Sequence, residues 1–256
     1  MHTFLSIVTP NEAVSKTSRY AIGISIGVVL LTGWFSATSI LFPSPLEVLL
    51  ALPNLWLQGG LGQEIINSFL LNLEAIGWSV GISLPLAYLC RVPVIQPLAA
   101  SLAKLRFLSP IVFYPVMLEA MSSGHGVKLG LLVLGESFFL TTTMIGVVQA
   151  IPEFQYDLAR TLRMSEWKSI WYVVIRGTVG QALDAIRDNA AMGWSMVMMV
   201  EGALRDEGGV GVMLLNNQKH IEFAEVYAIS LAILAVGVTQ DYLLGVLRKL
   251  VCPYDS

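Results

Sequence analysis

"YAIGISIGVVLLTGWFSATSILF", residues 20–42, runs for 23 positions without a charged residue. About 20 apolar residues in a helix are enough to cross the roughly 30 Å hydrocarbon core of a bilayer. The rest of the chain has the same character, since 55% of its 256 residues are hydrophobic and 13% are charged, against roughly a quarter charged in soluble domains. The sequence therefore predicts an all-α integral membrane protein, with residues 20–42 as its first span.

Five further apolar stretches predict about six transmembrane helices in a single domain. They are "SFLLNLEAIGWSVGISLPLAYLC" (68–90), "FLSPIVFYPVMLEAM" (107–121), "LGLLVLGESFFLTTTMIGVVQAI" (129–151), "NAAMGWSMVMMVEGAL" (189–204) and "VYAISLAILAVGVTQDYLLGVL" (226–247). The third and fifth are short for a full crossing. Pro110 and Pro115 break the third, and a broken helix is tolerated only where protein or water satisfies the freed carbonyls.

Small residues four apart occur within two of these spans. Gly23 and Gly27 lie in the first, and Gly77 and Gly81 in the second. Such pairs favour close approach of two helices, so we expect these glycines at packed helix surfaces.

The basic residues indicate how the chain is oriented. Lys16 and Arg19 follow a mixed leader, so the first span is expected to be retained rather than cleaved. Six spans with a cytoplasmic N-terminus place eleven basic residues inside and three outside (Lys128, Arg205 and Lys219), as the positive-inside rule requires. The inside set is Lys16, Arg19, Arg91, Lys104, Arg106, Arg160, Arg163, Lys168, Arg176, Arg248 and Lys249.

These assignments divide the chain into three segments. Residues 1–18 are expected to form a cytoplasmic or interfacial leader, 19–251 the transmembrane domain, and 252–256 a cytoplasmic tail. Arg187, at a predicted helix end, is left unassigned.

Residues 152–177 form a polar loop of both charge signs between the fourth and fifth spans. A helix over 152–168 would place Phe154, Leu158, Ala159 and Leu162 on one face and Asp157, Arg160 and Thr161 on the other. Ser165 is suited to cap a second short helix. Such a loop either lies on the lipid headgroups or docks a cytoplasmic partner.

Acidic residues within the spans are the candidates for an internal polar path. Glu74, Glu119, Glu136 and Glu201 lie in or at the ends of spans, and a carboxylate in lipid is costly enough that such residues normally face protein or water. Glu136 is the best internal candidate, with Thr141 nearby on the same helix; Glu201, Trp194 and Tyr114 are further candidates. Away from the span ends we find no Lys or Arg, so either these acids are protonated or paired or the solute is neutral or cationic.

Several kinds of chemistry are not indicated. A net charge of −3 argues against nucleic acid as a partner, and His2, His125 and His220 are too scattered for a metal site. No G-x-x-x-x-G-K-[ST] sequence occurs, so any ATP chemistry belongs to another chain. We predict no catalytic residue and no cofactor in this chain.

Four segments in order resemble the permeases of bacterial ABC importers, specifically the nitrate, sulfonate, taurine and bicarbonate type. "LRFLSPIVFYP" (105–115) is similar to the entry to their third span, and "SSGHGVKLGLLVLGESFF" (122–139) to their Phe-Gly-Ile-Gly turn and following helix. "EFQYDLARTLRMSEWKSIWYVVIRG" (153–177) is similar to their cytoplasmic Glu-Ala-Ala loop, and "MGWSMVMMVEGALRDEGGVGVML" (192–214) to a later segment.

The resemblance implies a type I importer permease, in which residues 152–177 dock on a cytoplasmic ATPase. On the family's pattern, Asp157, Leu158 and Ala159 occupy the Glu-Ala-Ala positions, of which only the last alanine is kept, and Arg163 occupies the position of the glycine. The implied ATPase contacts are Asp157, Leu158, Ala159, Leu162, Arg163 and Ser165. Because positive φ is costly for arginine, the turn at Arg163 is expected to have another geometry.

The resemblance also implies partners and a location. It predicts a bacterial inner-membrane protein with both termini in the cytoplasm, paired with a second permease copy, ATPase subunits that use ATP and Mg, and an extracytoplasmic solute-binding protein. The translocation path would lie at the dimer interface.

Two other functions stay open at this point. A proton-coupled secondary transporter would use Glu136 or Asp241 as a relay and would predict inverted repeats. A membrane-embedded enzyme would need convergent ionisable groups from several spans.

Overall fold

The computed structural model describes residues 16–36, 39 and 41–253, and the regular elements in this range are helices. Most of the predicted leader and tail, and part of the predicted first span, lie outside these residues. The main helices are α2 (Lys16–Ser36), α3 (Pro45–Leu57), α4 (Leu61–Tyr88), α5 (Gln96–Lys104), α6 (Tyr114–Ala120), α7 (Gly124–Gln149), α8 (Glu153–Thr161), α9 (Glu166–Ser169), α10 (Val179–Ala203), α11 (Val210–Lys219) and α12 (Phe223–Val251).

Short helical segments join several of these. The 3-10 turns are η1 (Leu89–Arg91), η2 (Leu105–Phe107), η3 (Pro110–Phe113) and η5 (Arg205–Glu207), and η4 (Ile170–Ile175) is a π-helix.

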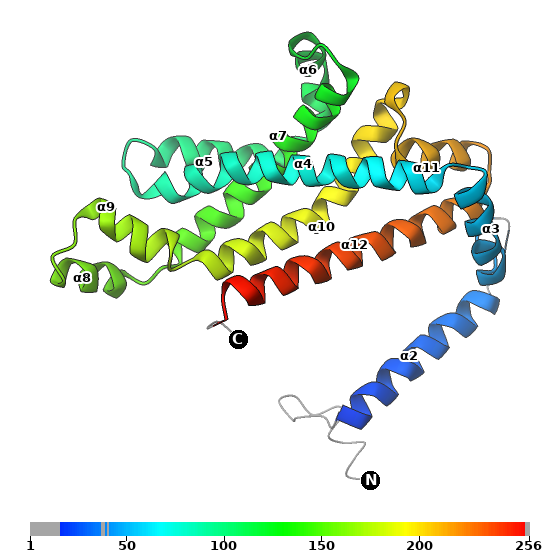
Figure 1. The fold of residues 1–256 in the computed structure, drawn as a ribbon, viewed down its shortest axis with the longest axis horizontal. Coiled ribbons are helices and arrows are strands. Elements are labelled where there is room, and N and C mark those ends of the chain that lie inside the picture. Colours follow the sequence, from blue (N-terminus) through cyan, green and yellow to red (C-terminus); the bar gives the residue numbers. More distant parts are fainter. Residues whose placement is uncertain (1–15, 37–38, 40, 254–256) are drawn as a thin grey trace.

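Four long helices form the body of the molecule. Helices α4, α10 and α12 run along its length and α7 crosses them obliquely, while α8 and α9 lie at one end and α3 and α11 at the other (Figure 1). Helix α2 leaves the α3 end and runs apart from the bundle (Figure 1), and none of the apolar window that it presents is buried. The packing of the other helices therefore does not depend on contacts with the apolar window of α2.

Length and composition identify four possible spans among the described residues. They are Thr17–Ser36, Leu61–Arg91, Gly124–Gln149 and Phe223–Val251. They correspond to the predicted first, second, fourth and sixth spans. The predicted third is broken at its prolines into η3 and α6, and Pro110–Ala120 falls among the shorter apolar helices.

The predicted fifth span belongs to a helix that is longer than the apolar stretch. We expected 189–204, whereas α10 begins ten residues earlier, at Val179. In the sequence, the charged residues at 184, 187 and 188 indicated a loop before the span. In the structure, Arg187 binds Asp241 of α12 and Asp184 pairs with Arg248, so the charges are accommodated inside a helix.

The expected glycine packing is also wrong within this chain. A Cβ built at Gly23, Gly27, Gly77 or Gly81 meets no atom within 4 Å. These helix surfaces are therefore open in the single chain.

Candidate functional site

The loop between α7 and α10 starts with a short helix that has a well-defined beginning. Pro152 directly precedes α8. Because proline has no backbone N–H to donate, it is not tolerated in the interior of a helix, which favours a helix start at this point. Glu153 then occupies the first turn, where a carboxylate interacts favourably with the helix dipole. The predicted helix over 152–168 is in fact two helices, α8 and α9, separated by a turn.

Arg163 makes that turn in the left-handed conformation, with φ of 56°. The Arg163 N–H donates to the Arg160 carbonyl at 2.9 Å, and the Met164 N–H donates to the Ala159 carbonyl at 3.0 Å. These two bonds form a Schellman closure, which normally uses glycine. Our expectation of a different geometry is therefore wrong: arginine adopts the glycine conformation, because two otherwise unsatisfied carbonyls gain partners.

A second cap and a π-helix complete the loop. Ser165 Oγ accepts a hydrogen bond from the Lys168 N–H at 3.4 Å, so the predicted cap of a second helix is confirmed. The chain then continues through η4 to Gly177. A Cβ there would lie 2.2 Å from the Val173 carbonyl oxygen, so the close backbone approach requires glycine.

Arg91, at the end of α4, anchors the loop to the bundle. Its guanidinium lies 4.7 Å from the centre of the Tyr156 ring, and Nη2 donates to the Val148 carbonyl at 3.3 Å. Burial raises the pKa of the Tyr156 phenol, against the opposing effect of the nearby Arg91 charge. From the sequence, Arg91 was predicted only to lie on the cytoplasmic side, and Tyr156 was given no role. The anchor could have been suspected at Arg91, because a basic residue at a span end has to find a partner.

The anchored loop leaves a cavity of about 550 Å³ between itself and the end of α4. Arg91, Pro93 and Tyr156 line one part, and Asp157, Arg160 and Trp167 another. Arg160 lies 3.4 Å from Asp157 and 3.5 Å from Glu166, which ties α8 to α9.

The apolar side chains of α8 and of Leu162, the residue that follows it, do not share one environment. Phe154, Leu158 and Leu162 are more than half exposed, at 65%, 57% and 62%, whereas Ala159 is buried. Asp157, Arg163 and Ser165 are exposed as well. Five of the six residues predicted to contact an ATPase therefore lie at the surface, and Ala159 instead faces the bundle.

Two of the predicted path residues belong to one buried polar cluster. Glu136 accepts a hydrogen bond from Ser79 at 3.1 Å, and Trp194 donates to Gln240 at 2.8 Å. Asn72 connects them: its amide nitrogen lies 3.4 Å from Gln240 Oε1. A Cβ at Gly193 would lie 2.6 Å from Asn72 Oδ1 and 2.8 Å from Glu136 Oε1, so both oxygens meet at this glycine.

The other predicted path residues lie elsewhere. Glu201 accepts from Ser68 Oγ at 2.6 Å and from the Gly211 N–H at 2.9 Å, which fixes the start of α11 against α4. Thr141 is buried in α7 and Tyr114 packs with the apolar cluster beside α6. Trp194 lines one small cavity and Glu201 lines another, and the side chains of Glu136 and Glu201 are buried.

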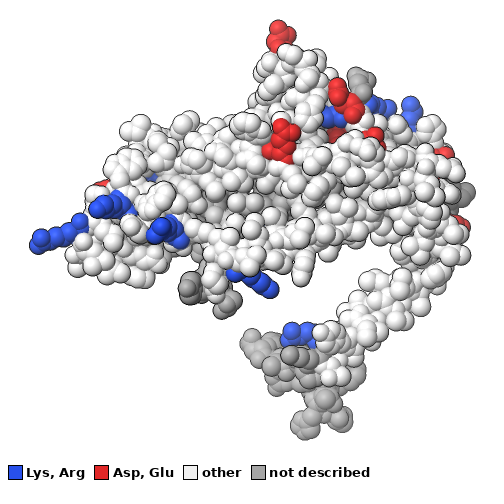
Figure 2. Space-filling view, viewed as in Figure 1, with Lys and Arg blue, Asp and Glu red and all other residues white. Residues whose placement is uncertain are grey.

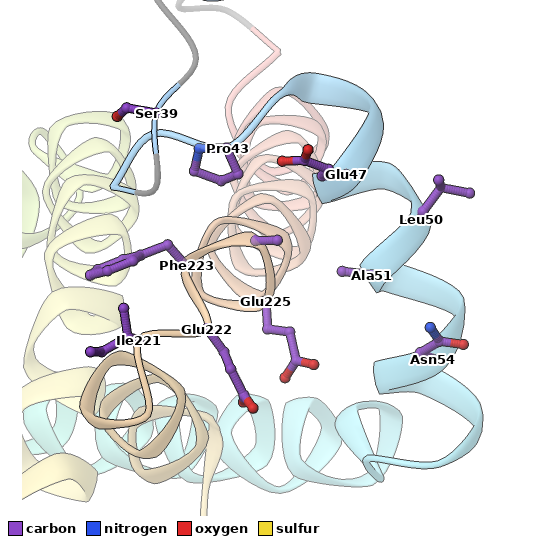
Figure 3. A pocket seen from close by; sticks show the side chains of 11 residues that line it. Ser39, Pro43, Glu47, Leu50, Ala51, Asn54, Ile221, Glu222, Phe223 and Glu225 are labelled. Carbon is purple, nitrogen blue, oxygen red and sulfur yellow. The ribbon is translucent and has the colours of Figure 1, made fainter.

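A second cavity, of about 730 Å³, lies at the opposite end of the molecule. Glu222 and Glu225, from the turn into α12, face the same space as Glu47 and Asn54 of α3 (Figure 3). Figure 2 shows the corresponding contrast in charge: the visible charges are almost all Lys and Arg near α8 and α9, and mostly Asp and Glu near α3 and α11.

Comparison with known proteins bears on this arrangement. No family profile matches the chain. It is 23% identical over 233 residues to the taurine transport system permease protein TauC of Escherichia coli, covering 83% of this chain and 82% of that protein. It is also 23% identical over 203 residues to the bicarbonate transport system permease protein CmpB of Synechocystis sp., covering 77% and 72%. The chain is a relative of the ABC importer permeases.

Solved structures have the same fold as this chain. A chain of the MetNI methionine ABC transporter, in inward-facing conformations, superposes with a TM-score of 0.63 at 13% identity, over 78% of this chain and 98% of that chain. A chain of an amino acid ABC transporter with histidines gives 0.61 at 16% identity, over 74% and 92%. The relatives are transport subunits rather than enzymes, which confirms the type of protein predicted, and ABC permeases work with separate ATPase and binding-protein subunits.

Proposed function

We propose that this permease is the membrane subunit of an ATP-driven importer and that its α8–α9 loop transmits the motion of a separate ATPase. The observation that carries the proposal is an exposed apolar surface on a loop that is bonded to the bundle. Phe154, Leu158 and Leu162 point away from the bundle, while Arg91 and Tyr156 hold the loop to α4 and α7. A loop built in this way binds a partner on one side and moves with the spans on the other.

The proposed ATPase contact is formed by Phe154, Asp157, Leu158, Leu162 and Arg163. The three apolar side chains would enter an apolar groove, because their burial is worth roughly 1.5–3 kcal/mol each. The neighbouring carboxylate and guanidinium would fix the orientation of the partner. Ser165 contributes indirectly, since it holds the start of α9.

The proposed orientation places this loop in the cytoplasm, with both termini on the same side, in a bacterial inner membrane. The excess of Lys and Arg at the α8–α9 end supports this (Figure 2). The acidic end, with the cavity beside α3, would then face the extracytoplasmic binding protein (Figure 3).

We further propose a homodimer with the translocation path between the two copies. Support comes from the open helix surfaces of the single chain, such as those at Gly77 and Gly81 of α4. The predicted path residues Glu136 and Trp194 would lie behind this surface and would stabilise the bundle. The relatives TauC and CmpB, named for taurine and bicarbonate transport, suggest a small solute with an anionic group.

Co-elution of the ATPase tests the proposal. The permease is produced together with the ATPase encoded beside it, and the complex is purified through a tag on the permease. Asp157→Lys with Leu158→Lys should abolish co-elution, because two exposed contact residues become cationic while the bundle is untouched. The matched control is Leu50→Lys, an exposed apolar residue of α3 at the other end. Unchanged co-elution of the double variant would contradict the docking assignment.

A further inference from the structure

Two ion pairs join α10 to α12 on a surface that the single chain leaves open. Arg187 donates through Nε and Nη2 to the two carboxylate oxygens of Asp241. Arg248 Nε lies 2.7 Å from Asp184 Oδ1. The four side chains are between 30% and 43% exposed, so each pair has a side that faces out of the bundle.

The Arg187–Asp241 pair involves a residue inside the predicted sixth span, 226–247. At about 1.5 Å of rise per residue, α12 is about 43 Å long and Asp241 lies about 15 Å from its end at Val251. The hydrocarbon core is about 30 Å thick, which leaves about 13 Å of α12 outside it. With this excess divided equally between the two ends of α12, Asp241 lies about 8 Å inside the core.

A lipid-facing position for this pair is physically unfavourable. Charged side chains within a membrane normally face the bundle interior or water, because their transfer to hydrocarbon costs several kcal/mol. Pairing lowers that cost, but the exposed side of each group still has to be solvated.

Small residues leave the space beside the pair open. Ala191 lies one turn along α10 from Arg187 and is exposed. A Cβ at Gly245 of α12 would lie 3.6 Å from Arg187 Cζ, so glycine leaves the guanidinium uncovered on that side. An open surface with paired charges at this depth is what a water-filled path requires.

We propose that this surface of α10 and α12 lines the water-filled translocation path, and that Arg187 and Asp241 determine specificity for a zwitterionic solute. The inference rests on the proposed transport function and assigns residues to its path. The anionic group of the solute would replace Asp241 on Arg187, and its ammonium group would replace Arg187 on Asp241. Arg248 and Asp184, nearer the cytoplasmic end, would offer the same exchange a second time.

The charges favour a zwitterion over a simple anion. Asp241 pairs with Arg187, and Asp184 and Asp188 lie three residues before it and one residue after it in α10. The carboxylates therefore offset the attraction of the guanidinium for a purely anionic solute. A zwitterionic solute would give each charged side chain a new partner of opposite charge, and the net charge of the site would stay the same.

Charge-selective labelling of a cysteine beside the pair tests this assignment. Ala191→Cys is introduced together with Cys252→Ser, while Cys90 is buried and is kept. The purified permease–ATPase complex is treated with sulfonatoethyl methanethiosulfonate, which is anionic, or trimethylammonioethyl methanethiosulfonate, which is cationic. Both should react. Arg187→Gln should slow the anionic reagent several-fold and Asp241→Asn the cationic one, whereas Lys249→Cys, at the exposed end of α12, should react equally in all backgrounds.

Two results would overturn the proposal. One is labelling by neutral N-ethylmaleimide alone, which would place Ala191 in lipid; the other is rates that do not depend on Arg187 or Asp241, which would leave the pair a purely structural link. Arg187→Lys retains a cation and should restore the anionic rate, which separates loss of charge from loss of fold. Failure of the ATPase to co-elute with the parent chain would overturn the importer function instead.

Protection by solutes tests the zwitterion directly. Taurine carries an amine and a sulfonate, and ethanesulfonate lacks the amine. Taurine should slow labelling of Ala191→Cys by either reagent several-fold more than ethanesulfonate does. Equal protection by both, or by neither, would overturn the zwitterion assignment.

Discussion

At position 163 an arginine has the backbone conformation that glycine adopts most readily. The left-handed region costs a residue with a Cβ roughly 1–2 kcal/mol. Arg163→Gly should therefore stabilise the end of α8 by about 1 kcal/mol, measured by hydrogen exchange of the loop amides. Gln155→Gly, within the same helix, should instead destabilise it by about 1 kcal/mol. Equal effects of the two glycines would show that the left-handed conformation carries no strain.

Gly193 allows two polar side chains to meet in the core. An alanine methyl there would overlap Asn72 Oδ1 and Glu136 Oε1, at 2.6 and 2.8 Å. Gly193→Ala should lower the free energy of unfolding by about 1–3 kcal/mol, because overpacking shifts both groups. Gly146→Ala, with no atom within 4 Å, should be neutral or slightly stabilising. Thermal unfolding of the two purified variants distinguishes them, and equal midpoints would contradict the tight packing at Gly193.

Single residues differ in how far sequence reveals them. Ser165 was predictable as a cap, because a serine before Glu-Trp-Lys has a local hydrogen-bond partner. Glu136 was predicted on a path, and in the single chain it is buried. Its hydrogen-bond partner Ser79 lies 57 residues earlier in the sequence, on another helix. A local pattern cannot supply the facing residue.

Among the elements, η4 and Gly177 form the joint between the loop and α10. Gly177→Ala would place a methyl 2.2 Å from a backbone oxygen, so the π-helix has to rearrange. We expect the variant to retain the ATPase but to lose most of the solute-stimulated hydrolysis, measured in proteoliposomes with the binding protein. Gly146→Ala, which meets no atom within 4 Å, is the control. Normal stimulation in Gly177→Ala would show that the joint does not transmit motion.

The long apolar helices were the easiest elements to predict. Their composition alone identifies α4, α7 and α12. The start of α10 was missed because Asp184 and Arg187 interrupt the apolar pattern, and their partners lie on α12. The π-helix left no local signal in the sequence, and Val174 within it is buried in a cluster with residues of other helices.

For the whole molecule, the contrast in charge between the two ends predicts which end is accessible from outside (Figure 2). The two cysteine variants are made in a protein that also carries Cys252→Ser. In intact cells, a membrane-impermeant maleimide should label Lys219→Cys but not Lys168→Cys. Permeabilised cells should label both, since both positions are exposed. Labelling of Lys168→Cys in sealed cells would invert the orientation, and the proposed ATPase contact with it.

The separation of α2 from the bundle has a consequence for biosynthesis. The three buried clusters draw their buried residues from α3 onwards, and of α2 only Trp34 packs against any of them. We therefore expect α3 to α12 to reach their native packing when α2 is supplied as a separate polypeptide. A split gene with its break between these two parts should still yield an assembled transporter.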